Sequence, residues 1–294
     1  MKSLWQNRNW GPMLLKEIAK PFDSKDYIYE LKFDGIRAIC YASPTKVTII
    51  SRNQKDITHL FPELQEIKKI VKNNVIFDGE IIALDQGKPS FSKIQERIHA
   101  KSPDRIQILS AENPIQYMVF DIIFEQKNLI DWPLMDRKER LNQYKDLNCF
   151  VKVPYYEEKG IKLFQQVKKR HLEGIVAKLK YGKYYPSCRT NEFIKIKNIQ
   201  REKFYIGGYD DTLKKEAISL ALGEYRNNQL YFVGKVTVSK NKKIYQEVKK
   251  MRKTKSHFVE EINNINFVKP IKQVSIEFLE KTKNNHLRHP VYKE

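Results

Sequence analysis

The chain has 294 residues, of which 41 % are hydrophobic and 12 % aromatic, and its formal net charge at pH 7 is +20. This apolar and aromatic content excludes a disordered protein, and no apolar stretch approaches the roughly 20 residues of a membrane-spanning helix. The positive charge indicates a polyanionic partner, of which nucleic acid is the commonest, with a generic lysine-rich surface as the alternative.

The first two thirds of the chain alternate between strand-like and helix-like segments. Period-two alternation and unbroken apolar runs predict strands at Tyr27–Lys32, Ala38–Tyr41, Lys46–Ile50, Val75–Phe77, Glu80–Leu84, Ile115–Phe124, Gly174–Leu179 and Phe193–Lys197. Between two of these strands, the dipeptide Asp78-Gly79 is predicted to form a turn. Helical spacing predicts helices at Phe61–Lys72, Leu134–Tyr144 and Ile161–Leu172. The pattern indicates an α+β domain with much antiparallel sheet.

The composition changes near Asn198–Lys203. Residues 1–200 carry 35 basic and 24 acidic side chains, whereas residues 201–294 carry 20 and 11, so the shorter part holds almost half of the net charge. We therefore predict one domain over 1–199 and a second over 200–294. In the second, strands are predicted at Lys203–Tyr209, Leu220–Tyr225, Gln229–Val238 and Ser275–Lys281, with a hairpin turn at Asn227-Asn228 and a helix at Ile244–Arg252. Several short strands in so small a domain predict a β-barrel.

The cysteines constrain the compartment. Cys40, Cys149 and Cys188 are far apart in sequence, and none belongs to a CxxC pair, which disfavours a zinc site and a disulfide framework. Because the N-terminal residues also lack the apolar stretch of a signal peptide, we expect a protein of the reducing cytoplasm.

The most distinctive local sequence is Glu30-Leu-Lys32-Phe-Asp34-Gly35-Ile-Arg37. Lys32 ends an alternating strand and precedes a turn that contains glycine. A lysine becomes a useful nucleophile where burial and neighbouring cations depress its pKa, and a strand end beside a tight turn can hold it rigidly. On its own, however, a K-x-D-G sequence is also what any charged β-turn contains.

Further motifs follow in a definite order along the chain. They are Ser51-Arg52-Asn53, Asp78-Gly79-Glu80, Tyr117–Asp121, Glu173–Lys178, Tyr185–Arg189 and Phe193–Lys197. In the last of them, a spacing of two places Lys195 and Lys197 on the same face of a strand.

In this order the motifs resemble those of the ATP-dependent DNA ligases, within the superfamily of covalent nucleotidyltransferases that also contains RNA ligases and mRNA capping enzymes. The segments Pro12-Met13-Leu14 and Leu287-Arg288-His289-Pro290-Val291 are similar to the two ends of bacterial ligases of the end-joining type. The resemblance covers nearly the whole chain, and the ordered motifs together are specific although each alone is weak. It implies an α+β fold, with an antiparallel nucleotidyltransferase (adenylation) domain followed by a small β-barrel OB-fold domain.

The resemblance also implies the activity. We expect an ATP-dependent DNA ligase that seals 5′-phosphate/3′-hydroxyl nicks in duplex DNA through a lysine–AMP intermediate and an adenylated DNA 5′ end. Its cofactors would be ATP and Mg²⁺, with Mn²⁺ as the substitute metal, and it would act as a monomer on nicked duplex DNA. Whether an end-bridging protein takes part, and whether the role is replication, repair, end joining or part of a phage programme, stays open. The alternatives are an RNA ligase of the same superfamily and a non-catalytic DNA-binding protein on a ligase scaffold.

Carried over to this sequence, the resemblance assigns roles to individual residues. Lys32 is the nucleophile that carries AMP, Glu30 is expected near the adenine, and Phe120 is expected to stack on it. Glu80 and Glu173 are expected around the ribose and the metal, since Mg²⁺ prefers oxygen ligands and keeps several waters. Arg37 and Arg52 are expected at the ribose and phosphate region of the nucleotide or at the DNA 5′-phosphate. Arg189, Lys195 and Lys197 are expected at the phosphates, where cations compensate the charge that develops during phosphoryl transfer.

The chain departs from the family pattern at three positions. Gln54 and Ser187 stand where glycine is common, and Phe193 stands where tryptophan is usual. A turn without glycine at Ser187 could change how Arg189 is aimed.

Other basic residues lie outside these motifs. The stretch 240–255 holds eight basic side chains and one acid, Glu247, and is expected to follow a DNA backbone rather than form a solvated helix. Arg97, His99 and His171 are expected to be surface or DNA-facing residues, because no metal-ligand spacing supports a histidine site.

Overall fold

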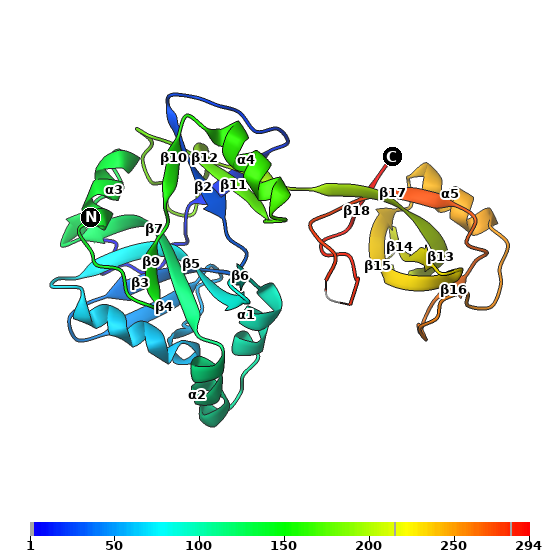
Figure 1. The fold of residues 1–294 in the computed structure, drawn as a ribbon, viewed down its shortest axis with the longest axis horizontal. Coiled ribbons are helices and arrows are strands. Elements are labelled where there is room, and N and C mark those ends of the chain that lie inside the picture. The colour runs from blue at the N-terminus through cyan, green and yellow to red at the C-terminus, as the bar shows by residue number, and fades with distance from the viewer. Residues whose placement is uncertain (1–2, 215, 283) are drawn as a thin grey trace. The chain divides into compact units, whose positions relative to one another are not determined.

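The computed structural model describes residues 3–214, 216–282 and 284–294. The chain divides into two compact units at Lys197 and Asn198, two residues before the boundary expected from the change in charge. Each unit has its own sheets and its own core (Figure 1). In the described part of the chain, no helix combines the length and the apolarity that crossing a bilayer would require.

The larger sheet of the first unit has seven strands. Its main path runs β4-β3-β5-β7-β8, while β6 pairs with β5 and β9 pairs with β7. The bounds are β3 (Ile36–Ala42), β4 (Val47–Ser51), β5 (Val75–Asp85), β6 (Lys88–Pro89), β7 (Ile115–Glu125), β8 (Lys127–Asn128) and β9 (Phe150–Lys152). The apolar runs of β5 and β7 lie at its centre, as expected for strands that are buried on both faces.

Short helices cover one face of this sheet. They are the 3-10 helices η1 (Thr58–Leu60) and η2 (Pro62–Lys69) and the α-helices α1 (Phe91–Ile98) and α2 (Pro103–Glu112). Leu64, Ile67, Ile94 and Ile106 from these helices are buried in the same cluster as the inward side chains of β3, β5 and β7. The sequence pattern predicted a longer helix at Phe61–Lys72 and none at the positions of α1 and α2.

A second, five-stranded sheet has the order β1-β12-β11-β2-β10. Its strands are β1 (Leu14–Ile18), β2 (Tyr27–Lys32), β10 (Tyr155–Glu157), β11 (Gly174–Leu179) and β12 (Arg189–Lys197). Helix α4 (Gly160–Lys169) lies over β2 and β11 (Figure 1) and packs Phe164 and Val167 onto them. Helix α3 (Leu134–Asn142) contributes Leu134 to the cluster that also contains residues of both sheets.

The segment Asp78-Gly79 is not a turn, which corrects the prediction. Strand β5 runs without interruption from Val75 to Asp85, and Asp78 and Gly79 lie in its middle. A Cβ atom at Gly79 would lie 2.5 Å from the Tyr117 ring, so this glycine permits the close approach of β7 rather than a reversal of the chain. Asp78 can be buried in a strand because Arg37 pairs with it.

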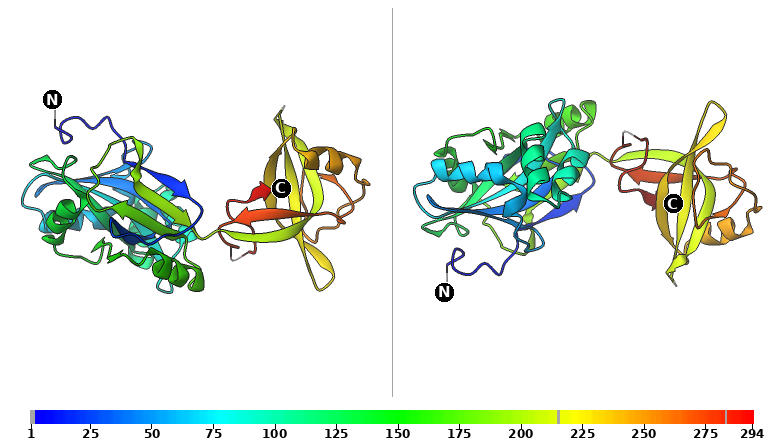
Figure 2. Two further views of the ribbon diagram at one scale, coloured as in Figure 1. Left: turned by 90° about the horizontal axis from the view of Figure 1, so that it is seen from above. Right: turned by 90° about the horizontal axis from the view of Figure 1, so that it is seen from below.

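The second unit contains a six-stranded sheet with the order β15-β14-β13-β17-β18, and β16 pairs with β13. The bounds are β13 (Gln200–Lys214), β14 (Ala217–Arg226), β15 (Gln229–Ser239), β16 (Asn266–Phe267), β17 (Gln273–Phe278) and β18 (Val291–Lys293), and the helix α5 is Lys243–Lys250. The long strands β13 to β15 are strongly curved (Figure 2). The hairpin turn at Asn227-Asn228 is confirmed, because both residues have positive φ and Arg226 pairs with Gln229.

Candidate active site

A cavity of about 540 Å³ in the first unit brings together side chains from both of its sheets. Eight of the residues singled out in the sequence line this cavity, and they come from motifs as far apart as residues 30 and 195. They are Glu30, Lys32, Arg37, Arg52, Glu80, Phe120, Arg189 and Lys195. Glu173 is not among the residues that line the cavity, but it pairs with Lys32, which is. Lys197 does not line the cavity.

Lys32 is the last residue of β2, where it lies opposite Gly174 at the start of β11. Its Nζ atom is 2.8 Å from Oε1 and 2.9 Å from Oε2 of Glu173. The Lys32 side chain is 21 % exposed, so it lines the cavity instead of extending into bulk water. The turn that follows is close-packed, because a Cβ atom at Gly35 would lie 2.1 Å from the Ile81 carbonyl oxygen. The amine is therefore held at a defined point of the wall.

Glu80 lies on β5, directly opposite Arg37 on β3. Burial raises the pKa of Glu80 to about 7, while Arg37 and Lys32 act in the opposite direction and the Glu173 and Asp78 carboxylates add to the rise. Glu80, Glu173 and Lys32 thus form one electrostatically coupled group. Within the described residues, no set of three or more His, Cys, Asp and Glu side chains is arranged to hold a metal by itself.

Arg37 forms an ion pair with the buried carboxylate of Asp78. Its Nε and Nη2 atoms each donate to Asp78 at 2.7 Å, and the Asp78 side chain is fully buried. Burial alone would lower the pKa of Arg37, but the Asp78 carboxylate raises it well above its usual value. Tyr184 donates to the same carboxylate at 2.6 Å and accepts from the Met13 amide at 3.0 Å. The Arg37 guanidinium also lies 4.3 Å from the centre of the Phe120 ring, so it forms part of the wall behind that ring.

The apolar end of the cavity is formed by Phe120, Val176 and Phe193. Phe120 is 8 % exposed, with Arg37 and Lys178 near its ring. Such a surface accepts a flat aromatic group by stacking. The place of Phe193 among the lining residues shows that phenylalanine fills this position of the wall.

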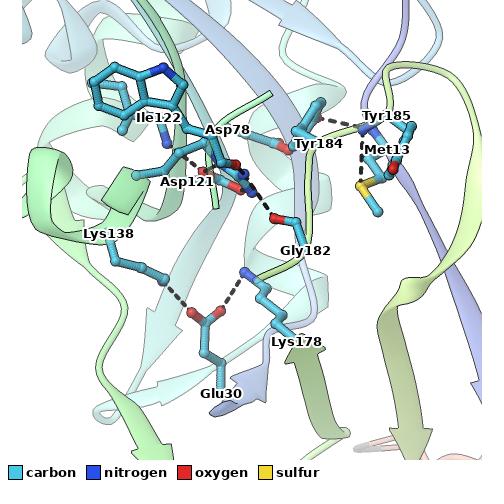
Figure 3. Close-up of polar contacts among 12 residues, drawn as sticks. Met13, Glu30, Asp78, Asp121, Ile122, Lys138, Lys178, Gly182, Tyr184 and Tyr185 are labelled. Carbon is cyan, nitrogen blue, oxygen red and sulfur yellow. Dashed lines mark hydrogen bonds and ion pairs between the residues drawn. The ribbon is translucent and has the colours of Figure 1, made fainter. Parts of the chain in front are cut away.

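Glu30 is held between two buried lysines, Lys138 and Lys178 (Figure 3). Lys178 lies 2.7 Å from Glu30, and Lys138 donates to the other carboxylate oxygen. Burial lowers the pKa of Lys178 to about 8, although Glu30 opposes this effect. The Lys178 ammonium has no partner with hydrogen-bond geometry among the described residues, and it lies 4.1 Å from the centre of the Phe120 ring.

The sequence interpretation assigned no role to either lysine. Lys178 belongs to a motif that was recognised, whereas Lys138 lies in a helix whose many charges are typical of a solvated surface. A signal was nevertheless present in the spacing of four residues of α3, which places them on one face of a helix. These residues, all buried, are Leu134, Arg137, Lys138 and Leu141. Lys138 thus occupies a place on the inward face of the helix.

The remaining cations differ in how firmly they are paired. Arg52 and Arg189 are exposed, and neither forms an ion pair with any residue that the structure describes. Lys195 and Lys197 both contact Oε2 of Glu17 at 3.0 Å. Burial would raise the pKa of Glu17, but the two lysines lower it overall. Glu17 was not recognised in the sequence, since no local pattern links it to a strand that lies so far along the chain.

Arg97 is neither exposed nor DNA-facing, which corrects the expectation. It is fully buried, and its guanidinium donates to Glu63 at 2.7 and 2.9 Å and to the Leu60 and Asn113 carbonyls. It therefore joins α1 to η2 and to the end of α2. His99 and His171 are exposed, as expected.

The basic stretch 240–255 of the second unit is only partly neutralised. Lys242, Lys243 and Lys249 pair with the carboxylates of Glu294, Glu247 and Asp211. No ion pair with a described residue is formed by Lys240, Lys250, Arg252, Lys253 and Lys255. Four of them, Lys250, Arg252, Lys253 and Lys255, lie at and beyond the end of α5, and Lys240 precedes the helix.

Comparison with known proteins agrees with this geometry. The family model described as the ATP dependent DNA ligase domain matches residues 12–197, and the model of the ATP dependent DNA ligase C terminal region matches residues 214–294. The SPbeta prophage-derived DNA ligase-like protein LigB of Bacillus subtilis is 30 % identical over 286 residues, which cover 96 % of this chain and 97 % of that protein. The multifunctional non-homologous end joining protein LigD of Mycolicibacterium smegmatis is 26 % identical over 97 % of this chain, which spans 38 % of that longer protein.

Solved structures share the fold. A mycobacterial DNA ligase D complexed with ATP and MES superimposes with a TM-score of 0.59 at 22 % identity, covering 97 % of this chain and 94 % of the other. A Lig E DNA ligase, whose structure concerns DNA binding with a minimal scaffold, superimposes with a TM-score of 0.66 at 17 % identity, covering 97 % and 98 %.

Proposed function

Because this chain belongs to the family of ATP-dependent DNA ligases, and acts as such a ligase, we propose that Lys32 is the residue that carries AMP to a nick in duplex DNA. The first unit is accordingly a nucleotidyltransferase domain, and the second is the OB-fold domain of the family. The observation that carries the proposal is the Lys32 amine at the wall of a cavity, beside Glu173 and among cations from four other motifs.

The first step transfers AMP to the protein. The Lys32 ammonium loses its contact with Glu173 and releases its proton to water, and the amine nitrogen attacks the α-phosphorus of ATP. An N–P bond forms, the bond between the α-phosphorus and its bridging oxygen breaks, and pyrophosphate leaves with the electron pair. Arg52, Arg189 and Lys195 line the cavity where they can compensate the negative charge on the phosphate oxygens.

The next steps return the lysine to its resting state. An oxygen of the DNA 5′-phosphate attacks the phosphorus of the bound AMP, the N–P bond breaks, and the Lys32 nitrogen regains a proton. The 3′-hydroxyl then releases its proton to water and attacks the DNA phosphorus, so that a phosphodiester forms while the bond from this phosphorus to the AMP oxygen breaks and AMP leaves with the electron pair. Each step exchanges one bond at phosphorus for another, and catalysis consists mainly of positioning and charge compensation.

The adenine fits the apolar end of the cavity. Phe120 and Val176 offer surfaces on which a flat base can stack, and the buried Glu30 carboxylate lies at the same end. We propose that a base bound there directs its ribose and phosphates toward Lys32. We assign Glu30 and Phe120 to the adenine on this basis, and Glu80 to the ribose.

The residues around Lys32 fit a divalent cation. The pKa of Glu80 is raised by burial and by two neighbouring carboxylates, a situation that a cation relieves. We propose that Glu80 and Glu173 would hold Mg²⁺, or Mn²⁺ in its place, with water and phosphate oxygens completing the shell. When bound, the ion would supply positive charge at the α-phosphate.

DNA is the substrate, and we propose that the unpaired cations of the stretch 240–255 contact its backbone. Ligation needs a grip on the duplex but no sequence readout, and lysine and arginine side chains at phosphates provide such a grip. We further propose that the protein acts as a monomer in the cytoplasm.

Intact-mass measurement tests the nucleophile directly. Incubation with ATP and Mg²⁺ should add the mass of one AMP to the wild type but none to Lys32→Ala, while Lys127→Ala, which changes an exposed lysine of β8, should behave as the wild type. A wild type without the added mass would favour the non-catalytic alternative. A Lys32→Ala variant that gains AMP would show that the nucleophile is misassigned.

Sealing assays distinguish a DNA ligase from an RNA ligase. Matched nicked duplexes that differ only in having DNA or RNA strands at the nick should show faster sealing of DNA. Preferential sealing of RNA would instead favour the RNA ligase alternative.

A further inference from the structure

The segment Trp10-Gly11 lies between the two loops that carry Arg52 and Arg189. Gln54 Nε2 donates to the Trp10 carbonyl, and the Gly11 amide donates to Ser187 Oγ at 2.8 Å. The Ser187 amide in turn donates to the Gly11 carbonyl at 2.8 Å. A Cβ atom at Gly11 would lie 3.6 Å from both Gln54 Nε2 and Ser187 Oγ, so the two side chains converge on one residue from opposite loops.

Both side chains belong to residues with an unfavourable backbone conformation. Gln54 and Ser187 each have φ of 61°, in the left-handed region that favours glycine. Glycine would relieve this strain at either position, but it has no side chain with which to reach Trp10 or Gly11. The two non-glycine residues therefore provide contacts that the favoured residue cannot make.

The bridging segment is itself anchored. Upstream, the Trp5 ring stacks against Phe124 with 6.0 Å between ring centres, and the Leu4 amide donates to Asn128 Oδ1 at 3.1 Å. Downstream, the Leu14 amide donates to the Cys188 carbonyl at 2.8 Å as β1 begins. A segment fastened at both ends can hold the two loops at a set distance from each other.

The two loops lead to arginines that form no ion pair with a described residue, although Arg189, the first residue of β12, donates to the Leu15 carbonyl. Arg52 precedes Gln54 by two residues and Arg189 follows Ser187 by two, and both arginines line the cavity. The Arg52 amide is tied to the Arg37 carbonyl and the Gln54 amide to the Ser51 carbonyl, so the loop moves as a unit. The position of each arginine then depends on how its loop is held.

We propose that Gln54 and Ser187 are positioning residues, and that their bridge through Trp10 and Gly11 sets the separation of Arg52 and Arg189 for the phosphate chain of ATP. The identity of the anion rests on the proposed function, whereas the bridge itself does not. Loss of either side chain breaks the bridge between the loops, while the backbone hydrogen bonds from the Ser187 amide to Gly11 and from the Arg52 amide to Arg37 remain.

Hydrogen exchange without nucleotide tests the bridge independently of activity. Ser187→Ala should speed exchange of the Arg52 and Gln54 amides, which lie on the opposite loop, and Gln54→Met should speed exchange at Cys188. Both variants keep a Cβ and remove only the hydrogen-bonding group. Gln126→Met is the matched control, since Gln126 is an exposed glutamine with φ of 58° whose side chain forms no hydrogen bond with a described residue.

AMP transfer to Lys32 at increasing ATP concentrations tests the positioning role. Ser187→Ala and Gln54→Met should each raise KM for ATP by about threefold to tenfold, as expected for one lost hydrogen bond. The double variant should fall short of the product of the two effects, because both bonds serve one bridge. Gln126→Met should leave KM unchanged.

The glycine variants separate positioning from stability. Ser187→Gly and Gln54→Gly relieve the backbone strain, so their melting temperatures should equal or exceed that of the wild type while KM still rises. Exchange changes confined to the mutated loop, or an unchanged KM in all variants, would overturn the inference. A wild type that takes up no AMP would refute the proposed function instead, and the exchange experiment would still decide whether the bridge exists.

Discussion

Two substitutions in the buried cluster of Glu30, Lys138 and Lys178 should lower the free energy of unfolding by different amounts. Glu30→Gln removes the carboxylate that pairs with both buried ammonium groups and leaves them facing each other. Removing the partner from a buried charge costs about 3–5 kcal/mol of stability. We expect a loss of unfolding free energy in that range, because Lys138 and Lys178 have 3 % of their side chains exposed and little access to water.

Lys138→Met should cost less. It leaves Glu30 paired with Lys178 at 2.7 Å, and it removes a positive charge that lowers the pKa of Lys178. We expect a loss of about 1.5–3 kcal/mol, the range of one hydrogen bond to a charged group. The same substitution should raise the pKa of Lys178 above about 8.

Urea unfolding at pH 7 measures both losses on one scale. The reasoning would be refuted if Lys138→Met destabilised the protein as much as Glu30→Gln, or if Glu30→Gln had almost no effect. A matched control is Lys127→Met, which changes an exposed lysine of the same unit and should alter stability by no more than about 0.5 kcal/mol.

Two further predictions concern protons and salt. Because the pKa of Glu80 in the folded protein is about 7, above that of an ordinary glutamate, the folded state binds this proton more tightly, and stability should fall as the pH rises from about 4.5 to 7. Glu80→Gln should flatten this decline in urea unfolding across that pH range, and an unchanged profile would contradict the assignment. Arg252→Ala with Lys253→Ala should weaken binding of nicked duplex DNA and reduce the slope of log K against log salt by about 1.8, which fluorescence anisotropy can measure. Lys243→Ala, whose lysine lies beside Glu247, should change the slope less.

The sequence pattern predicted the strands that alternate or run apolar without interruption, such as β2, β7 and β11. It failed at Asp78-Gly79, where a local turn signal was overridden by contacts with residues far along the chain. Arg37 lies 41 positions from Asp78, and the Tyr117 ring fills the space beside Gly79. Neither contact leaves a trace in the local sequence.

The candidate site was likewise predicted only in part from the sequence. Motif residues from strands of both sheets of the first unit line the cavity. The residues that support them come from outside the motifs. Lys138 lies on a helix, Glu17 on another strand, and both were missed because pairing across a fold depends on topology rather than on spacing. Arg97 was misread for the same reason, since its partner Glu63 lies 34 positions away.

The contact of Glu17 with both Lys195 and Lys197 has a consequence for turnover. Under the role proposed for Lys195 at the phosphates, the Glu17 carboxylate pairs with this lysine before a nucleotide binds, so nucleotide entry exchanges one anion for another. The exchange weakens the net attraction between the protein and the nucleotide, and Lys195 can pair with Glu17 again when pyrophosphate leaves. Weaker attraction favours turnover, because pyrophosphate must leave before duplex DNA, a far larger polyanion, can bind.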